Sequence, residues 1–172
     1  MGAGYLVREA RPDEFDGLGR LMVAVYAGLE GFPGPGEQPK YYDMLARIGL
    51  MAEKPGAKLL VAVADGKLLG GVVHFSDMAQ YGSGGTATQE RDAAGFRLLA
   101  VSPEARGLGV GRALVLYCIE LARAGGKAQV VIHSTEAMKV AWGMYERMGF
   151  RRSPDLDFLQ GELPVFGFRL KL

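Results

Sequence analysis

A glycine-rich turn between a predicted strand and a predicted helix is the first feature of the sequence that could perform chemistry. It lies within residues 98–112, which read LLAVSPEARGLGVGR. Its alternating glycines are Gly107, Gly109 and Gly111. Such a turn lets an anion approach the backbone N–H groups and the positive dipole end of the following helix. Because Arg106 and Arg112 flank the turn, the pattern predicts a phosphate or pyrophosphate site.

Known nucleotide motifs fit this turn unequally. A P-loop needs G-x-x-x-x-G-K followed by Ser or Thr, and the sequence has no such run. The dinucleotide fingerprint G-x-G-x-x-G fails because Arg112 stands sixth from Gly107 and Leu114 sixth from Gly109. A third pattern has Gln or Arg first, Gly fourth, and Gly or Ala sixth. Residues 106–111 (RGLGVG) match it.

A second segment lies one predicted strand further along, and both segments resemble the same family. Residues 141–150 read AWGMYERMGF and follow the spacing A-x-x-x-Y-E-x-x-G-F. With LAVSPEARGLGVGRALV before it, the chain resembles the GNAT superfamily of acyl-CoA-dependent N-acyltransferases. The resemblance covers most of the chain and is strongest from Phe96 to Phe150.

This resemblance implies acetyl-CoA as co-substrate and a binding site made largely of backbone. The strand before the turn would hydrogen-bond the pantetheine arm, and the turn would hold the pyrophosphate. The implied binding residues are Leu99, Ala100, Val101, Arg106, Gly107, Leu108, Gly109, Val110, Gly111, Arg112 and Ala141. Many members carry an asparagine where this chain has Met138, which leaves Lys139 or Thr135 as substitutes.

The resemblance also implies that Tyr145 is the general acid that protonates the departing thiolate. A phenol has a free pKa near 10 and a thiol one near 8.5. An attacking alkyl ammonium has a pKa near 10.4, so only about one molecule in two thousand is a free amine at pH 7, and a base is needed. The candidate bases are His74, Asp77, Glu90, Asp92, His133 and Glu136, and the sequence does not choose among them.

The elements that must position these residues follow from hydrophobic periodicity and turn signals. Strands are predicted at 5–9, 58–64, 67–75, 95–101 and 129–133, with two weak ones within 158–172. Helices are predicted at 14–29, with Asp13 as cap, and at 40–51, 106–124 and 136–148. The polar segment 82–92 is predicted to be a mobile loop, with a substrate lid as the alternative.

These elements indicate a single domain over residues 1–172, of α/β or mixed α+β class. Strand–helix–strand order predicts that strands 95–101 and 129–133 are parallel. The resemblance implies a GNAT-like mixed sheet of roughly six to seven strands with about four helices, as layered domains favour. It also implies that the parallel pair splays to bind acyl-CoA.

Composition excludes several other classes. A net charge of +1 argues against nucleic-acid binding. The lone Cys118 and two histidines show no metal-ligand spacing. No membrane-length apolar run and no leader peptide are visible, so a cytoplasmic protein without membrane contact is expected.

The predicted function is direct acetyl transfer, in a ternary complex, to the primary amine of a small molecule or peptide. Similar proteins often form homodimers, so a homodimer is an open expectation. One alternative is a non-catalytic acyl-CoA-binding module on the same fold. A weaker one is a protein whose glycine turn holds another diphosphate, such as ATP or NAD.

Overall fold

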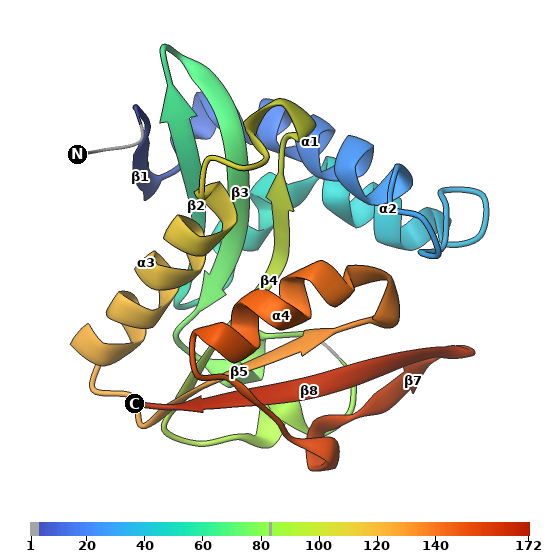
Figure 1. The fold of residues 1–172 in the computed structure, drawn as a ribbon, viewed down its shortest axis with the longest axis vertical. Coiled ribbons are helices and arrows are strands. Elements are labelled where there is room, and N and C mark those ends of the chain that lie inside the picture. The colour runs from blue at the N-terminus through green and yellow to red at the C-terminus, as the bar shows by residue number, and fades with distance from the viewer. Residues whose placement is uncertain (1–3, 83) are drawn as a thin grey trace. The chain divides into compact units, whose positions relative to one another are not determined.

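The computed structural model describes residues 4–82 and 84–172. The first three residues, used above for the leader-peptide expectation, and Ser83 of the polar loop lie outside the described residues. The helices and strands are β1 (Leu6–Glu9), α1 (Phe15–Ala27), α2 (Pro39–Ala46), β2 (Ala57–Ala64), β3 (Lys67–Phe75), β4 (Ala93–Val101), α3 (Val110–Ala124), β5 (Gln129–Ser134), α4 (Lys139–Arg147), β6 (Arg151–Arg152), β7 (Phe158–Gln160) and β8 (Leu163–Lys171) (Figure 1). None of the described helices is long and apolar enough to cross a membrane.

The strands form a mixed sheet in the order β1-β2-β3-β4-β5-β8-β6, and β7 pairs with β8 off this path. β4 and β5 are parallel, with Ala93–Gly95 in register with Gln129–Val131. This confirms the predicted parallel pair, whereas its splay beyond this register stays a prediction. The sheet has 8 strands, more than expected, because β6 is only 2 residues long and leaves no periodic signal.

The chain divides into two compact units, and we describe each by itself. The first comprises the residues up to Val73 together with Leu98–Tyr117, and the second comprises His74–Arg97 and Cys118–Leu172. β3, β4 and α3 each contribute residues to both units. The expectation of a single domain over residues 1–172 therefore stays a prediction.

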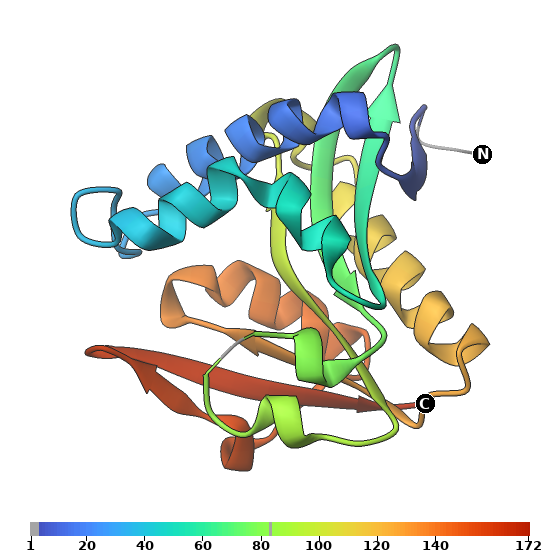
Figure 2. The same cartoon turned by 180° about the vertical axis from the view of Figure 1, so that it is seen from behind.

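In the first unit, two glycines of β3 let helices approach the strand on both of its faces. A Cβ on Gly70 would lie 2.9 Å from Val110 of α3, and one on Gly71 would lie 2.4 Å from Leu18 of α1. Because successive strand residues point to opposite faces, α1 and the start of α3 cover different faces of β3. α1 also contacts α2 closely, since a Cβ on Gly19 would lie 2.4 Å from a backbone oxygen of α2 (Figure 2).

The start of α1 differs from the prediction. A 3-10 helix at Pro12–Glu14 precedes α1, and no side-chain cap from Asp13 is found among the described residues. Glu14 instead accepts hydrogen bonds from the Arg8 guanidinium at 2.8 Å and from the Arg11 amide at 2.8 Å. Pro12 favours the tight first turn, and Glu14 reaches back to bond the Arg11 amide, whereas Asp13 was expected to cap an amide further along the helix.

In the second unit, aromatic side chains of α4 and β8 pack against one another. Trp142 of α4 lies 5.2 Å and 5.3 Å, between ring centroids, from Phe166 and Phe168. The polar segment expected to be mobile contains a 3-10 helix at 87–89. Its Glu90 forms an ion pair with Arg169 of β8, which ties the end of this segment to the sheet.

Candidate active site

The glycine turn lies in the first unit, between the end of β4 and the start of α3. A 3-10 helix at Pro103–Ala105 is followed by Gly107 at φ +83° and Gly109 at φ +77°. Glycine adopts such angles without the penalty that a Cβ brings. These angles are not helical, so α3 begins at Val110 rather than at the predicted Arg106.

The first amides of α3 have no partner within the helix. The amide of Ala113 donates to the carbonyl of Gly109 at 3.0 Å, which is the first bond of helical spacing. The amides of residues 109–112 therefore precede the helical ladder, and none of them donates to another backbone group in the described part of the chain. Such amides, together with the positive helix end, are suited to bind an anion.

The turn also has space and unpaired positive charge. A Cβ on Gly107 would meet nothing within 4 Å, and one on Gly109 would meet only the Tyr5 hydroxyl at 3.7 Å. Arg106 and Arg112 are both exposed, and among residues 4–82 and 84–172 no carboxylate forms an ion pair with either. The residues present thus fit the pyrophosphate of a coenzyme A molecule.

In the last residues of β4, the backbone N–H and C=O groups point alternately towards β3 and towards the opposite edge of the strand. The Ser102 amide donates to Leu69 of β3 at 2.8 Å. By strand alternation, Ala100 also faces β3, whereas Leu99 and Val101 face the opposite edge. The Tyr26 hydroxyl donates to the Leu99 carbonyl at 2.9 Å, which agrees with that direction. Leu99 and Val101 therefore have the orientation expected for pantetheine binding, and Ala100 does not.

Sequence reasoning missed a backbone irregularity in this strand. Leu98 has φ +64°, and the other described non-glycine residues with positive φ are Asp65 and Asp92. A left-handed leucine within a strand is a genuine outlier. Nothing in the residue type signals it, because leucine favours neither bulges nor turns.

Tyr145 lies in the second unit, on α4, and its ring is buried among aromatic rings. The centroids of Phe96, Phe150 and Phe168 lie 6.0, 5.6 and 6.3 Å away. Burial raises the pKa of Tyr145 above that of a free phenol, so the group stays protonated at neutral pH. Ala141 lies four residues earlier on α4 and therefore on the same helix face.

Two buried hydroxyls lie shortly before Met138 in the chain, the position where the resemblance leads one to expect an asparagine. Ser134 and Thr135 are 3% and 5% exposed, and within the described residues their hydroxyls have no hydrogen-bond partner. An unsatisfied buried polar group costs about 1–3 kcal/mol. They are therefore suited to meet a ligand, and Thr135 is one of the substitutes named from the sequence.

Several candidate bases are already engaged by neighbours. The His133 Nε2 donates to the Leu156 carbonyl at 2.8 Å, because a carbonyl only accepts. Its Nδ1, 3.1 Å from the Tyr81 hydroxyl, is then the acceptor. Burial lowers the pKa of His133, which favours this neutral form. Asp77 accepts from the Ala79 amide at 3.0 Å.

Of the remaining candidates, Glu90 pairs with Arg169, and Asp92 lies in a bend directly before β4, with φ +52°. His74 is buried, whereas Glu136 is exposed at the first position of the 3-10 helix that precedes α4. In the described residues, no group of three or more His, Cys, Asp or Glu side chains could hold a metal ion.

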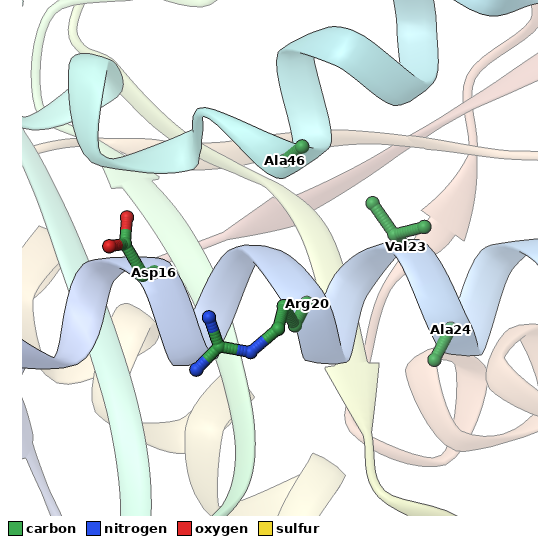
Figure 3. A pocket seen from close by; sticks show the side chains of 5 residues that line it. All are labelled: Asp16, Arg20, Val23, Ala24 and Ala46. Carbon is green, nitrogen blue, oxygen red and sulfur yellow. The ribbon is translucent and has the colours of Figure 1, made fainter.

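Two surface pockets in the first unit lie away from the predicted site residues. One, of about 350 Å³, is lined by Asp16, Arg20, Val23, Ala24 and Ala46 (Figure 3). The other, of about 640 Å³, adjoins it through Asp16 and Ala46 and extends to Arg47 and Glu53. No predicted coenzyme-binding residue lines either pocket.

Comparison with solved structures shows the fold. An acetyltransferase of the GNAT family from Staphylococcus aureus Mu50 aligns with a TM-score of 0.73 and 13% identity, covering 98% of this chain and 99% of that one. The PaiA N-acetyltransferase from Thermoplasma acidophilum, solved in complex with coenzyme A, aligns with a TM-score of 0.72 and 14% identity, covering 98% and 99%.

Comparison with known sequences shows the family. The mycothiol acetyltransferase of Cellulomonas flavigena is 35% identical over 112 residues, which are 63% of this chain and 30% of that protein. That of Arthrobacter sp. (strain FB24) is 30% identical over 140 residues, which are 81% of this chain and 41% of that protein. The chain thus spans less than half the length of these relatives. The Acetyltransferase (GNAT) family profile matches residues 22–150, most of the chain, which therefore belongs to the GNAT family of acetyltransferases.

Proposed function

We propose that the chain is an N-acetyltransferase that moves an acetyl group from acetyl-CoA to the primary amine of a small molecule or peptide. The observation that carries this proposal is the open glycine turn, where among the described residues the amides of 109–112 have no backbone partner and Arg106 and Arg112 have no ion-pair partner. The family membership and the coenzyme A bound to the similar PaiA N-acetyltransferase support it.

The binding roles divide between backbone and side chains. The amides of residues 109–112 would bind the pyrophosphate oxygens, and Arg106 and Arg112 would neutralise their charge. The outward backbone groups of Leu99 and Val101 would bind the pantetheine arm. When bound, acetyl-CoA would supply an acetyl group activated as a thioester.

Tyr145 would act as the general acid. The phenol is protonated at neutral pH, so it holds a proton to give to the thiolate that leaves when the amine attacks. Attack would be direct, because the one cysteine is unsuited to carry the acetyl group. Burial raises the pKa of the Cys118 thiol, and a cysteine nucleophile needs the thiolate form.

The second candidate is a non-catalytic acyl-CoA-binding module on the same fold. The engagement of Asp77, Glu90 and His133 by other groups favours it, since it leaves fewer bases for the amine. It predicts acetyl-CoA binding with no turnover on any amine.

Calorimetric titration with acetyl-CoA, with NAD and ATP as controls, tests the binding step. Selective binding of acetyl-CoA is expected. Folded protein that binds no acyl-CoA refutes the proposal, and tighter binding of NAD or ATP favours a different diphosphate ligand.

Release of free thiol in the presence of a panel of primary amines then tests catalysis. Tyr145→Phe is expected to lower kcat about 100-fold, as loss of a general acid does, without changing the Kd for acetyl-CoA. No turnover on any amine by protein that binds acetyl-CoA supports the binding module instead.

The cellular location, the partners and the oligomeric state of the protein are also proposals. We expect cytoplasmic action without nucleic-acid or membrane partners, and a homodimer. Cell fractionation and light scattering of the purified protein test these expectations.

A further inference from the structure

Tyr26, near the end of α1, links that helix to the backbone of β4 within the first unit. Its hydroxyl donates to the Leu99 carbonyl at 2.9 Å, and the residue is 5% exposed. Phe32 and Tyr41 hold its ring, with centroids 5.5 Å and 6.1 Å away. The hydroxyl is therefore fixed on the edge of β4 that faces away from β3.

The bonded carbonyl directly follows the irregular residue of the strand. Leu98 has φ +64°, a conformation that side chains with a Cβ disfavour and that persists only where the surroundings enforce it. The Leu98 side chain is buried, at 7% exposed. On the other side of Leu99, the Ser102 amide bonds to Leu69. The Tyr26 bond thus restrains the peptide between the irregular residue and the regular end of β4.

We propose that Tyr26 is a positioning residue for acetyl-CoA, an inference that rests on the proposed function. By holding the Leu99 carbonyl, it keeps the left-handed turn at Leu98 in place. It thereby directs the Leu99 amide and the Val101 backbone groups outward for the pantetheine arm. It also occupies the Leu99 carbonyl, which leaves the amide of that residue as the group available to the ligand.

The expected effect of losing the hydroxyl follows from a population argument. Without the bond, the strand adopts the binding-competent arrangement in only a fraction of molecules, and the apparent Kd rises by the inverse of that fraction. A neutral hydrogen bond of this kind corresponds to about a 2- to 10-fold change in such an equilibrium. Because bound acetyl-CoA restores the arrangement, kcat should change little.

Tyr26→Phe keeps the ring and removes the hydroxyl, and Tyr42→Phe is its matched control. Tyr42 is also 5% exposed in the first unit, and its hydroxyl donates to the Pro33 carbonyl at 2.6 Å. Three readouts are compared in full-length protein: the calorimetric Kd for acetyl-CoA, the melting temperature, and the NMR shift of the Ala100 amide, whose peptide includes the Leu99 carbonyl.

Both variants are expected to lower the melting temperature. Only Tyr26→Phe should raise the Kd and move the Ala100 resonance in ligand-free protein. An unchanged Kd in Tyr26→Phe, beside normal binding by the wild type, overturns the inference alone. An equal rise in Kd in Tyr42→Phe also overturns it, because the effect is then general loss of stability. A wild type that binds no acetyl-CoA overturns the proposed function, and this inference with it.

Discussion

Replacing Gly107 by alanine tests whether the glycine turn is a ligand cradle or only a bend. Gly107 has φ +83°, and a Cβ there would meet nothing within 4 Å. The substitution therefore causes backbone strain without a clash. A left-handed residue with a Cβ costs about 1–2 kcal/mol. For a chain of this size, that corresponds to a fall in melting temperature of about 2–8 °C.

Gly66→Ala is the matched control. Gly66 has φ +74° in the β2–β3 hairpin, and its Cβ would also meet nothing within 4 Å. The two variants should therefore lose similar stability. Their binding should differ, because only Gly107→Ala places a methyl group and a strained peptide in the space proposed for the pyrophosphate.

The difference should be large in a calorimetric titration with acetyl-CoA. A hydrogen bond to a charged group contributes about 1.5–3 kcal/mol, so losing one phosphate contact weakens binding roughly 10- to 100-fold. Gly66→Ala should bind as the wild type does. If Gly107→Ala binds acetyl-CoA as tightly as Gly66→Ala, the turn is a structural bend and the reasoning from its open space is wrong.

Four further variants, one of them a control, test the packing and the pH dependence of the fold by thermal melting. Gly19→Ala should destabilise strongly, because its Cβ would lie 2.4 Å from a backbone oxygen of α2, whereas Gly36→Ala meets nothing and should not. Hydrogen bonds from Arg8 lower the pKa of Glu14 from 4.5 to about 2. Stability from this pair should be complete above pH 4.5 and be lost as the pH falls towards 2, and Glu14→Gln should abolish that loss. Burial lowers the pKa of His133 below the ordinary histidine value of 6.5, so stability should fall on acidification below about pH 6.5; His133→Gln should flatten this dependence.

The sequence was most predictive where local backbone chemistry decides the structure. Asp65 and Gly66 adopt φ +50° and φ +74°, as an Asp-Gly hairpin turn requires, and β3 has the predicted bounds, Lys67–Phe75. The glycine turn was predictable for the same reason, since only glycine adopts its angles readily. The boundaries of helices were less predictable. The helix expected at 40–51 ends at Ala46, and a 3-10 helix continues from Ile48 to Glu53 with similar apolar spacing.

The candidate site was less predictable where tertiary contacts decide what a side chain can do. His133 at the end of an apolar strand has the residue type of a base, yet Leu156 and Tyr81 engage both of its ring nitrogens. Glu90 has the type of a base in a polar loop, yet Arg169 of β8 pairs with it. The partners are far away in the chain, so no local pattern could indicate these contacts.

Tyr26 is a further residue whose main contact could not be predicted from the local sequence. An apolar helix position predicts a packing residue, and the ring does pack, but the hydroxyl bonds to a carbonyl 73 positions further along the chain. The resemblance implied that the backbone of β4 binds the ligand, which stays a prediction, and a strand edge is suited to this because it offers N–H and C=O groups whatever its side chains. Which of those groups remain available depends on the neighbours that occupy the others. Ser102 is paired with Leu69, and the Leu99 carbonyl with Tyr26. The specificity of a backbone site therefore depends on side chains outside its own motif.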